Sequence, residues 1–281
     1  MIFWHNDSFI SEEEKQFSVQ ERVLRYGDGF FESMIAVNYR VLWLSEHYER
    51  IVSSAEILKL EIEKSFSQEK FAEILRELLQ KNDLKNARFR VVFYRKGEGL
   101  YAPQKNDAGV FITCSESPPI NSLSVIETMA IYAENKKALG SLSNVKSCNA
   151  LLYVMASLYA KEHNAQEAII LNAENNICEA ITANVFIIQQ HKIITPPLSS
   201  GCVAGVMRTK LLRELSTTSR ASVIEERAIS LAEISAADAV FLTNVSKGIQ
   251  AVRTINDSVY SIEKVRDVYA LYQKMLEREF V

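Results

Sequence analysis

The apolar residues of this chain recur with two different periods, and the period changes repeatedly along its 281 residues. A period of two is typical of a strand with one buried face, whereas a period near 3.6 indicates an amphipathic helix. Strand-like runs lie at residues 88–94, 110–114, 168–171, 184–188 and 239–243. Helical runs lie at 48–58, 71–79, 151–159 and 265–275, and we expect each to pack one face on a core. This alternation predicts a mixed α/β (α+β) fold.

One break interrupts the pattern near the middle of the chain. Pro118 and Pro119 stand among small polar residues between positions 115 and 122. Paired prolines continue neither a strand nor a helix. We therefore predict an N-terminal α/β domain at 1–120 and a C-terminal domain at 121–281.

The charge balance excludes several classes of protein. Lys and Arg number 32 against 35 Asp and Glu, for a net charge of -3. Without a concentrated basic face, a nucleic-acid partner is not expected.

No apolar run reaches the roughly 18 residues of a membrane span, so no membrane association is expected. The four cysteines form no C-x-x-C pair, which argues against a metal site, and the start lacks a secretory leader. We expect a reduced, cytoplasmic protein.

Four local patterns follow one another in the second half. A lysine stands in Ser143-Asn-Val-Lys146-Ser-Cys-Asn149, before a helical run. Glu179 and Thr182 precede a strand, glycines lead into a helix at Met207, and a strand ends at Thr243-Asn244. Each pattern alone has an ordinary structural explanation, such as a solvated lysine or a polar turn. The helix start would suit a phosphate, because its N–H groups lack intrahelical partners.

The ordered set resembles the class IV aminotransferases, the fold-type IV pyridoxal phosphate enzymes. The first half agrees, since Arg25-Tyr-Gly-Asp-Gly-Phe-Phe-Glu32 resembles the family's Y-G-D-G-x-F-E segment. Leu44-Ser-Glu-His-Tyr-Glu-Arg50 resembles its E-H-x-x-R helix start. The resemblance covers roughly residues 20 to 253. It implies a small N-terminal α/β domain and a larger C-terminal domain with a barrel-like sheet.

The resemblance also implies pyridoxal 5′-phosphate as the cofactor. Lys146 would be the catalytic residue, forming a Schiff base with the cofactor and then moving a proton as a general base. Glu179 would pair with the pyridine nitrogen and keep it protonated, which makes the ring a better electron sink. Thr182 would orient this contact through a hydrogen bond.

Further residues would hold the phosphate and the substrate. Arg50 would bind the phosphate through its guanidinium. The remaining phosphate contacts implied by the family are the backbone amides of Val206 and Met207 and the region of Asn244, Val245 and Ser246. The predicted substrate-binding residues are Phe31, His47 and Arg95.

Some positions depart from the family pattern. Met207 stands where many members have a threonine that reaches the phosphate, and Val245 lies near another such position. The tyrosine that branched-chain members carry about five residues after the lysine is missing. The segment 95–101 lacks the arginine and histidine, two apart, of the D-amino acid branch.

Three functions are compatible with these motifs. The leading hypothesis is an aminotransferase that moves an amino group between a small amino acid and a 2-oxo acid. The first alternative is an aminodeoxychorismate lyase, which forms 4-aminobenzoate and pyruvate, and the second is a non-catalytic binding protein that keeps the fold. Donor, acceptor and L or D stereochemistry stay open. By resemblance we expect a homodimer.

Overall fold

The chain divides into two compact units in a computed structural model that describes residues 1–14, 18–118, 122–217 and 224–280. The N-terminal unit comprises Met1–Pro119 and Val145–Asn149, and the C-terminal unit comprises Ile120–Asn144 and Ala150–Val281. The boundary predicted near residue 120 falls at 119–121, outside the described residues. The segment that carries Lys146 thus belongs to the N-terminal unit. The single domain boundary predicted from the sequence does not describe this return of the chain.

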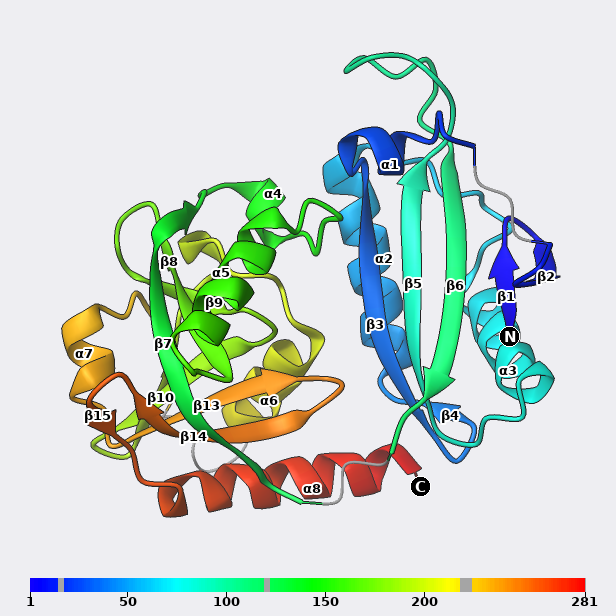
Figure 1. Cartoon of the computed structure of the whole chain (residues 1–281). Coiled ribbons are helices and arrows are strands. Elements are labelled where there is room, and N and C mark those ends of the chain that lie inside the picture. Colours follow the sequence, from blue (N-terminus) through cyan, green and yellow to red (C-terminus); the bar gives the residue numbers. More distant parts are fainter. Residues whose placement is uncertain (15–17, 119–121, 218–223, 281) are drawn as a thin grey trace. The chain divides into compact units, whose positions relative to one another are not determined.

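An antiparallel sheet with strand order β2-β1-β6-β5-β3-β4 forms the frame of the N-terminal unit (Figure 1). The expected strands at 88–94 and 110–114 and helices at 48–58 and 71–79 are confirmed. The elements are β1 (Ile2–His5), β2 (Ser8–Ser11), α1 (Arg22–Tyr26), β3 (Gly29–Val37), β4 (Arg40–Val41), α2 (Leu44–Leu58), α3 (Gln68–Lys81), β5 (Ala87–Arg95) and β6 (Ala108–Glu116).

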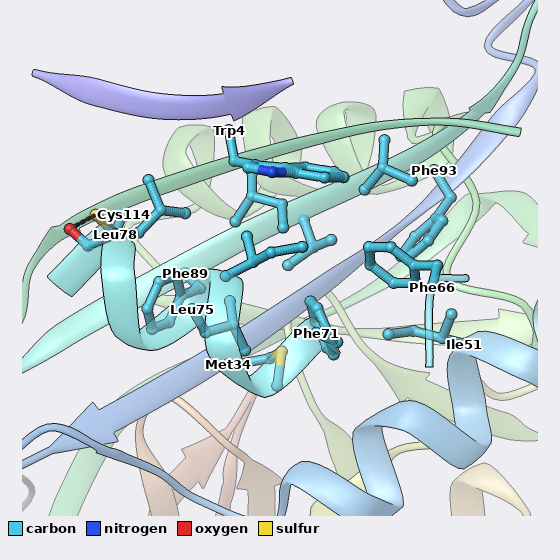
Figure 2. Close-up of a cluster of buried hydrophobic side chains, with 14 of the residues drawn as sticks. Trp4, Met34, Ile51, Phe66, Phe71, Leu75, Leu78, Phe89, Phe93 and Cys114 are labelled. Atoms are coloured by element: carbon cyan, nitrogen blue, oxygen red, sulfur yellow. Dashed lines mark hydrogen bonds between the residues drawn. The ribbon is translucent and has the colours of Figure 1, made fainter. Parts of the chain in front are cut away.

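One face of this sheet packs on helices and the other does not. On β5, Phe89 and Val91 are completely buried, whereas the alternating Arg88 and Arg90 are exposed. Figure 2 shows Phe89 in a cluster with residues of α2, α3 and β1, such as Phe71 and Trp4. Truncating a buried phenylalanine to alanine typically costs about 3–5 kcal/mol, so this cluster fixes the helix-bearing face. The opposite face carries Arg88 and Arg90 together with apolar residues such as Phe31 and Val92.

A curled half-barrel sheet forms the C-terminal unit, with strand order β12-β11-β10-β13-β14-β7-β8-β9 and β15 paired to β14. The strands predicted at 168–171, 184–188 and 239–243 are confirmed. The strands are β7 (Ser124–Lys137), β8 (Glu167–Asn172), β9 (Ile177–Ala180), β10 (Asn184–Gln189), β11 (Lys192–Thr195), β12 (Ile224–Glu226), β13 (Ala239–Asn244), β14 (Gly248–Ile255) and β15 (Ser258–Val259).

The helices of this unit include the two predicted at 151–159 and 265–275 (Figure 1). They are α4 (Ser141–Asn144), α5 (Leu151–Glu162), α6 (Val206–Thr217), α7 (Leu231–Ser235) and α8 (Arg266–Phe280). Among the described residues, no helix combines the length and apolarity that crossing a membrane requires.

The packing predicted for α5 is wrong. Leu151, Val154, Met155 and Leu158 were expected to face a core, but they are 72%, 50%, 39% and 49% exposed. The sheet side of the helix is instead formed by small residues such as Ala156, which is completely buried. Periodicity identifies an apolar stripe without saying what covers it.

Candidate active site

The Lys146 segment extends one edge of the N-terminal sheet. The amide of Phe31 donates to the carbonyl of Lys146 at 2.9 Å, and the amide of Cys148 donates to the carbonyl of Gly29 at 2.9 Å. Ser147 forms an antiparallel bridge with Phe30 between them. These bonds fix the backbone of Lys146 to β3. The sequence had indicated only a loop that precedes a helix.

Two cations lie over the ring of Phe31. The Lys146 Nζ atom lies 4.6 Å from the ring centre, and the Arg90 guanidinium carbon lies 3.9 Å from it. Arg90 is exposed as a whole residue, but partial desolvation of its guanidinium lowers its pKa. Burial raises the pKa of the neighbouring Cys148 thiol to about 11, which keeps that thiol neutral. Sequence reasoning missed Arg90. Its signal was the alternation of arginine with Phe89 and Val91, which places it on the face without helices.

Arg50 and His47 share one buried carboxylate, that of Glu32 on β3. Arg50 donates from Nε to Glu32 Oε1 at 2.7 Å and from Nη2 to Oε2 at 2.5 Å. His47 Nδ1 lies 2.7 Å from the same Oε2. Burial would raise the pKa of Glu32, but the two partners hold it at about 2. Burial also lowers the pKa of His47, which is completely enclosed. This enclosure indicates that His47 positions Glu32 and Arg50 and does not suit the predicted contact with substrate.

The guanidinium of Arg95 is bound by groups of the protein itself. Its guanidinium binds the Asp28 carboxylate, with Nε 3.1 Å from Oδ2, and donates to Asn106 Oδ1 at 2.6 Å. It also donates to the carbonyls of Leu58 and Lys59 at the end of α2, at 2.6 and 3.0 Å. With 7% exposure, Arg95 caps a helix and ties a loop, so its predicted role in substrate binding is not supported by this geometry.

Glu179 lies on β9 of the C-terminal unit, paired with Ile170 of β8, and is 3% exposed. Its Oε1 accepts hydrogen bonds from Lys137 Nζ and, at 2.7 Å, from the Tyr153 hydroxyl. Its Oε2 accepts the Val203 amide at 2.8 Å. An ionised carboxylate offers about four lone-pair positions. Among the residues that the structure describes, these bonds leave one position, on Oε2, for a further donor.

The loops beside β9 and β13 are tied to each other. Asn244 Nδ2 donates to the carbonyl of Thr182, and Asn244 Oδ1 accepts the amide of Ser246 at 2.7 Å. The Thr182 hydroxyl donates to Glu167 at 2.7 Å, so the predicted hydrogen bond that orients Glu179 is replaced by one to another carboxylate. Val245 is buried between Asn244 and Ser246.

The N-terminus of α6 begins directly after Gly205. A Cβ atom at Gly205 would lie 2.0 Å from Asn184 Oδ1, so only glycine fits against that side chain. Asn184 Nδ2 donates to the carbonyl of Val203 at 2.9 Å and thereby fixes the turn. Val206 and Met207 stand in the first helical turn, where backbone N–H groups have no intrahelical acceptor. The turn can therefore offer amide donors to an anion.

Solved structures identify the class of fold. A branched-chain aminotransferase from Thermoproteus uzoniensis matches with a TM-score of 0.87 at 24% identity, over 98% of this chain and 94% of that one. The branched-chain amino acid aminotransferase of Escherichia coli matches with 0.84 at 21%, over 95% and 92%. A Legionella pneumophila protein provisionally described as a 4-amino-4-deoxychorismate lyase matches with 0.83 at 21%, over 94% and 97%. The predicted two-domain fold-type IV architecture is confirmed.

Sequence comparison then identifies the family. The model described as amino-transferase class IV matches residues 29–255, and the chain belongs to this family of enzymes. A D-alanine aminotransferase of Staphylococcus epidermidis is 25% identical over 256 residues, 89% of this chain and 88% of that one. The branched-chain-amino-acid aminotransferase of Escherichia coli is 24% identical over 267 residues, 90% and 84%. The resemblance drawn from the motifs and the prediction of an aminotransferase-class enzyme are confirmed.

Proposed function

We propose that this chain is a pyridoxal 5′-phosphate-dependent aminotransferase that exchanges an amino group between a small amino acid and a 2-oxo acid. The observation that carries the proposal is the fixed amine of Lys146, held by β3 over an aromatic ring. The C-terminal unit carries a carboxylate that retains one acceptor position and a glycine-bounded helix start. An amine, an acceptor for a ring N–H and donors for a phosphate are what this cofactor requires.

When bound, the cofactor would supply an aldehyde for the amine and a ring that accepts electrons from the substrate Cα. Lys146 would hold the cofactor through its aldehyde. Once released, its amine would act as a general base and move a proton from the substrate Cα to the former aldehyde carbon of the cofactor. The Phe31 ring limits the positions open to this amine. Glu179, which accepts a hydrogen bond from Lys137, would accept the N–H of the ring.

The phosphate would be held by residues of two kinds. Arg50 would offer its guanidinium, oriented by the two hydrogen bonds to Glu32. Val206 and Met207 would offer backbone amides at the start of α6. In the turn of Asn244, Val245 and Ser246, the Ser246 amide already donates to Asn244 Oδ1, so the Val245 amide and the Ser246 hydroxyl would be the donors. Met207 carries no hydroxyl, so only its amide can serve.

Arg90 is the residue we propose for the substrate carboxylate, in place of Arg95. It reaches the same ring as Lys146 and carries a charge that suits a carboxylate. Phe31 would then line the substrate side, as expected from the sequence. All amino acids present this carboxylate, so the proposal leaves the side-chain preference open.

A lyase reaction is the second candidate, favoured by the fold match to the Legionella protein. The same proton removal by Lys146 would then lead to elimination. The two functions differ in their need for an acceptor. Mixing the loaded protein with single amino acids should convert the pyridoxal form to the pyridoxamine form, and a 2-oxo acid should reverse the change. Pyruvate release from aminodeoxychorismate without a 2-oxo acid would favour the lyase, and no reaction with either would support a binding protein.

We also propose a homodimer in the cytoplasm. The support for a subunit contact is an apolar patch on α5, formed by the exposed side chains of Leu151, Val154, Met155 and Leu158. Single exposed apolar residues are common, but contiguous patches often mark interaction surfaces. The four unpaired cysteines support a reducing compartment. Sedimentation of the wild type and of Val154→Glu tests the dimer, which the charge should weaken. A monomeric wild type would contradict it.

A further inference from the structure

Lys137 and Tyr153 form a closed hydrogen-bonded triangle with Glu179. Lys137 Nζ donates to the Tyr153 hydroxyl at 2.6 Å, that hydroxyl donates to Glu179 Oε1 at 2.7 Å, and Lys137 also donates to Oε1. Lys137 ends β7 and Tyr153 lies in the first turns of α5. Neither residue belongs to a motif that the sequence singled out.

The triangle lies almost out of contact with water. Lys137 and Glu179 are 7% and 3% exposed, so the ion pair is screened far less than a surface pair. Removing one partner would leave the other charge buried, which is strongly unfavourable. Because the lysine approaches Oε1 and the Val203 amide approaches Oε2, the two partners act on different oxygens.

The ionisable groups around Glu179 leave one strong charge beside it. Burial, together with Glu179, raises the pKa of Tyr153, so the phenol keeps its proton and donates it. The thiols of Cys178 and Cys202 also lie within electrostatic range of the carboxylate, and burial raises their pKa values, so both are neutral. Lys137 is therefore the cation that the described surroundings place against Glu179.

A carboxylate shared with a cation is a weaker base than one without it. A weaker base holds the proton of a ring nitrogen less firmly, and the cation also repels a protonated ring. The degree to which a carboxylate stabilises a protonated ring nitrogen thus depends on its other hydrogen-bond partners, which for Glu179 include Lys137 and Tyr153.

We propose that Lys137 and Tyr153 are positioning residues for Glu179, and that their hydrogen bonds to its Oε1 leave the pyridine nitrogen less firmly protonated than a carboxylate without them would. This inference rests on the proposed function, because it requires Glu179 to face that nitrogen. It adds a means by which this chain moderates the electron demand of the cofactor ring.

The test is the ¹⁵N resonance of pyridine-labelled pyridoxal 5′-phosphate bound to the full-length protein, followed with pH. Lys137→Met should raise the pH midpoint at which this resonance changes by about one unit or more, since removing a nearby cation favours the protonated ring and a neighbouring charge commonly changes a pKa by about one to three. Lys137→Arg should stay close to the wild type. Lys136→Met is the matched control, because this exposed neighbour contacts Asn175 and not Glu179.

Tyr153→Phe removes one donor without removing charge, and should shift the midpoint in the same direction by a smaller amount. It also carries the test if Lys137→Met does not fold. An unchanged midpoint in the folded, loaded variants would overturn the inference. Failure of the wild type to attach the cofactor through Lys146 would instead overturn the proposed function, so the two failures are distinct.

Discussion

The amine of Lys146 lies 4.6 Å from the centre of the Phe31 ring, while the backbone carbonyl of Lys146 accepts the Phe31 amide at 2.9 Å. One residue of β3 thus fixes both the main chain and the side chain of the lysine. A flexible lysine would otherwise lose considerable rotamer freedom each time it reacts. The arrangement supports the proposed place of Phe31 beside the reacting amine, although its side chain has no group that reacts.

Replacing the Phe31 ring should therefore slow the reaction without unfolding the protein. Cation–π contacts contribute about 0.5–2 kcal/mol, and each 1.4 kcal/mol is a factor of ten. We expect Phe31→Leu to lower kcat/KM by about 2- to 30-fold, measured by the half-reaction with an amino acid donor. Phe111→Leu on strand β6 of the same sheet serves as the control and should leave the rate within about 2-fold.

Arg90 should affect substrate affinity more than turnover. Hydrogen bonds to charged groups contribute about 1.5–3 kcal/mol, so Arg90→Gln should raise KM for the amino acid by about 10- to 150-fold with a smaller change in kcat. Arg88→Gln, on the same face of β5, is the matched control. Equal effects of the two substitutions on KM would show that the overall positive charge of this face, and not a specific contact of Arg90, binds the substrate carboxylate, and would contradict the proposal.

The carboxyl of Glu32 should make the fold sensitive to acid. Its pKa is about 2 in the folded protein against an ordinary 4.5. A group whose pKa is lowered by folding stabilises the protein above its unfolded pKa, and that stabilisation disappears as the pH falls toward the folded value. Urea unfolding should therefore show a loss of stability between pH 4.5 and about 2 that Glu32→Gln reduces.

Glu32→Gln should also be less stable near neutral pH, by about 3–5 kcal/mol, because Arg50 would lose its buried partner. Glu127→Gln removes an exposed ion pair with Arg253 and is the control, expected to change stability by less than about 1 kcal/mol. A parallel pH dependence in the wild type and Glu32→Gln would contradict this assignment.

A side chain at Gly205 should be unfavourable while Asn184 is present. A Cβ atom would lie 2.0 Å from Asn184 Oδ1, and overpacking of this kind typically costs about 1–3 kcal/mol. We expect Gly205→Ala to lower the melting temperature and to weaken cofactor retention on dialysis. Adding Asn184→Ala should recover part of the loss, and strictly additive effects of the two substitutions would argue against the clash.

The sequence predicts the elements of this fold well and their partners less well. The alternation of Phe89 and Val91 with arginines identified β5, because a strand with one buried face has a period of two. The same kind of periodicity failed for α5, since an apolar stripe has the same spacing whether a core or another surface covers it. Only the packing of Ala156 against the sheet reveals which side of α5 is inward.

The candidate site shows the same limit. Lys146 and Glu179 could be selected because motifs of the family surround them. The pairing of Lys137 with Glu179 spans 42 residues of chain and depends on how β7 and β9 curl, so no local pattern indicates it. Arg95 was selected as a charged residue near the substrate loop. Its guanidinium instead donates hydrogen bonds to the Asp28 carboxylate and to the Leu58 carbonyl at the end of α2.

The most direct test of the account is borohydride reduction of the full-length protein with pyridoxal 5′-phosphate, followed by peptide mapping. We predict that the reduced cofactor label appears on the peptide that contains Lys146 and disappears in Lys146→Ala. A label on the peptide of Lys137, the buried lysine beside Glu179, or no label on any peptide, would contradict it.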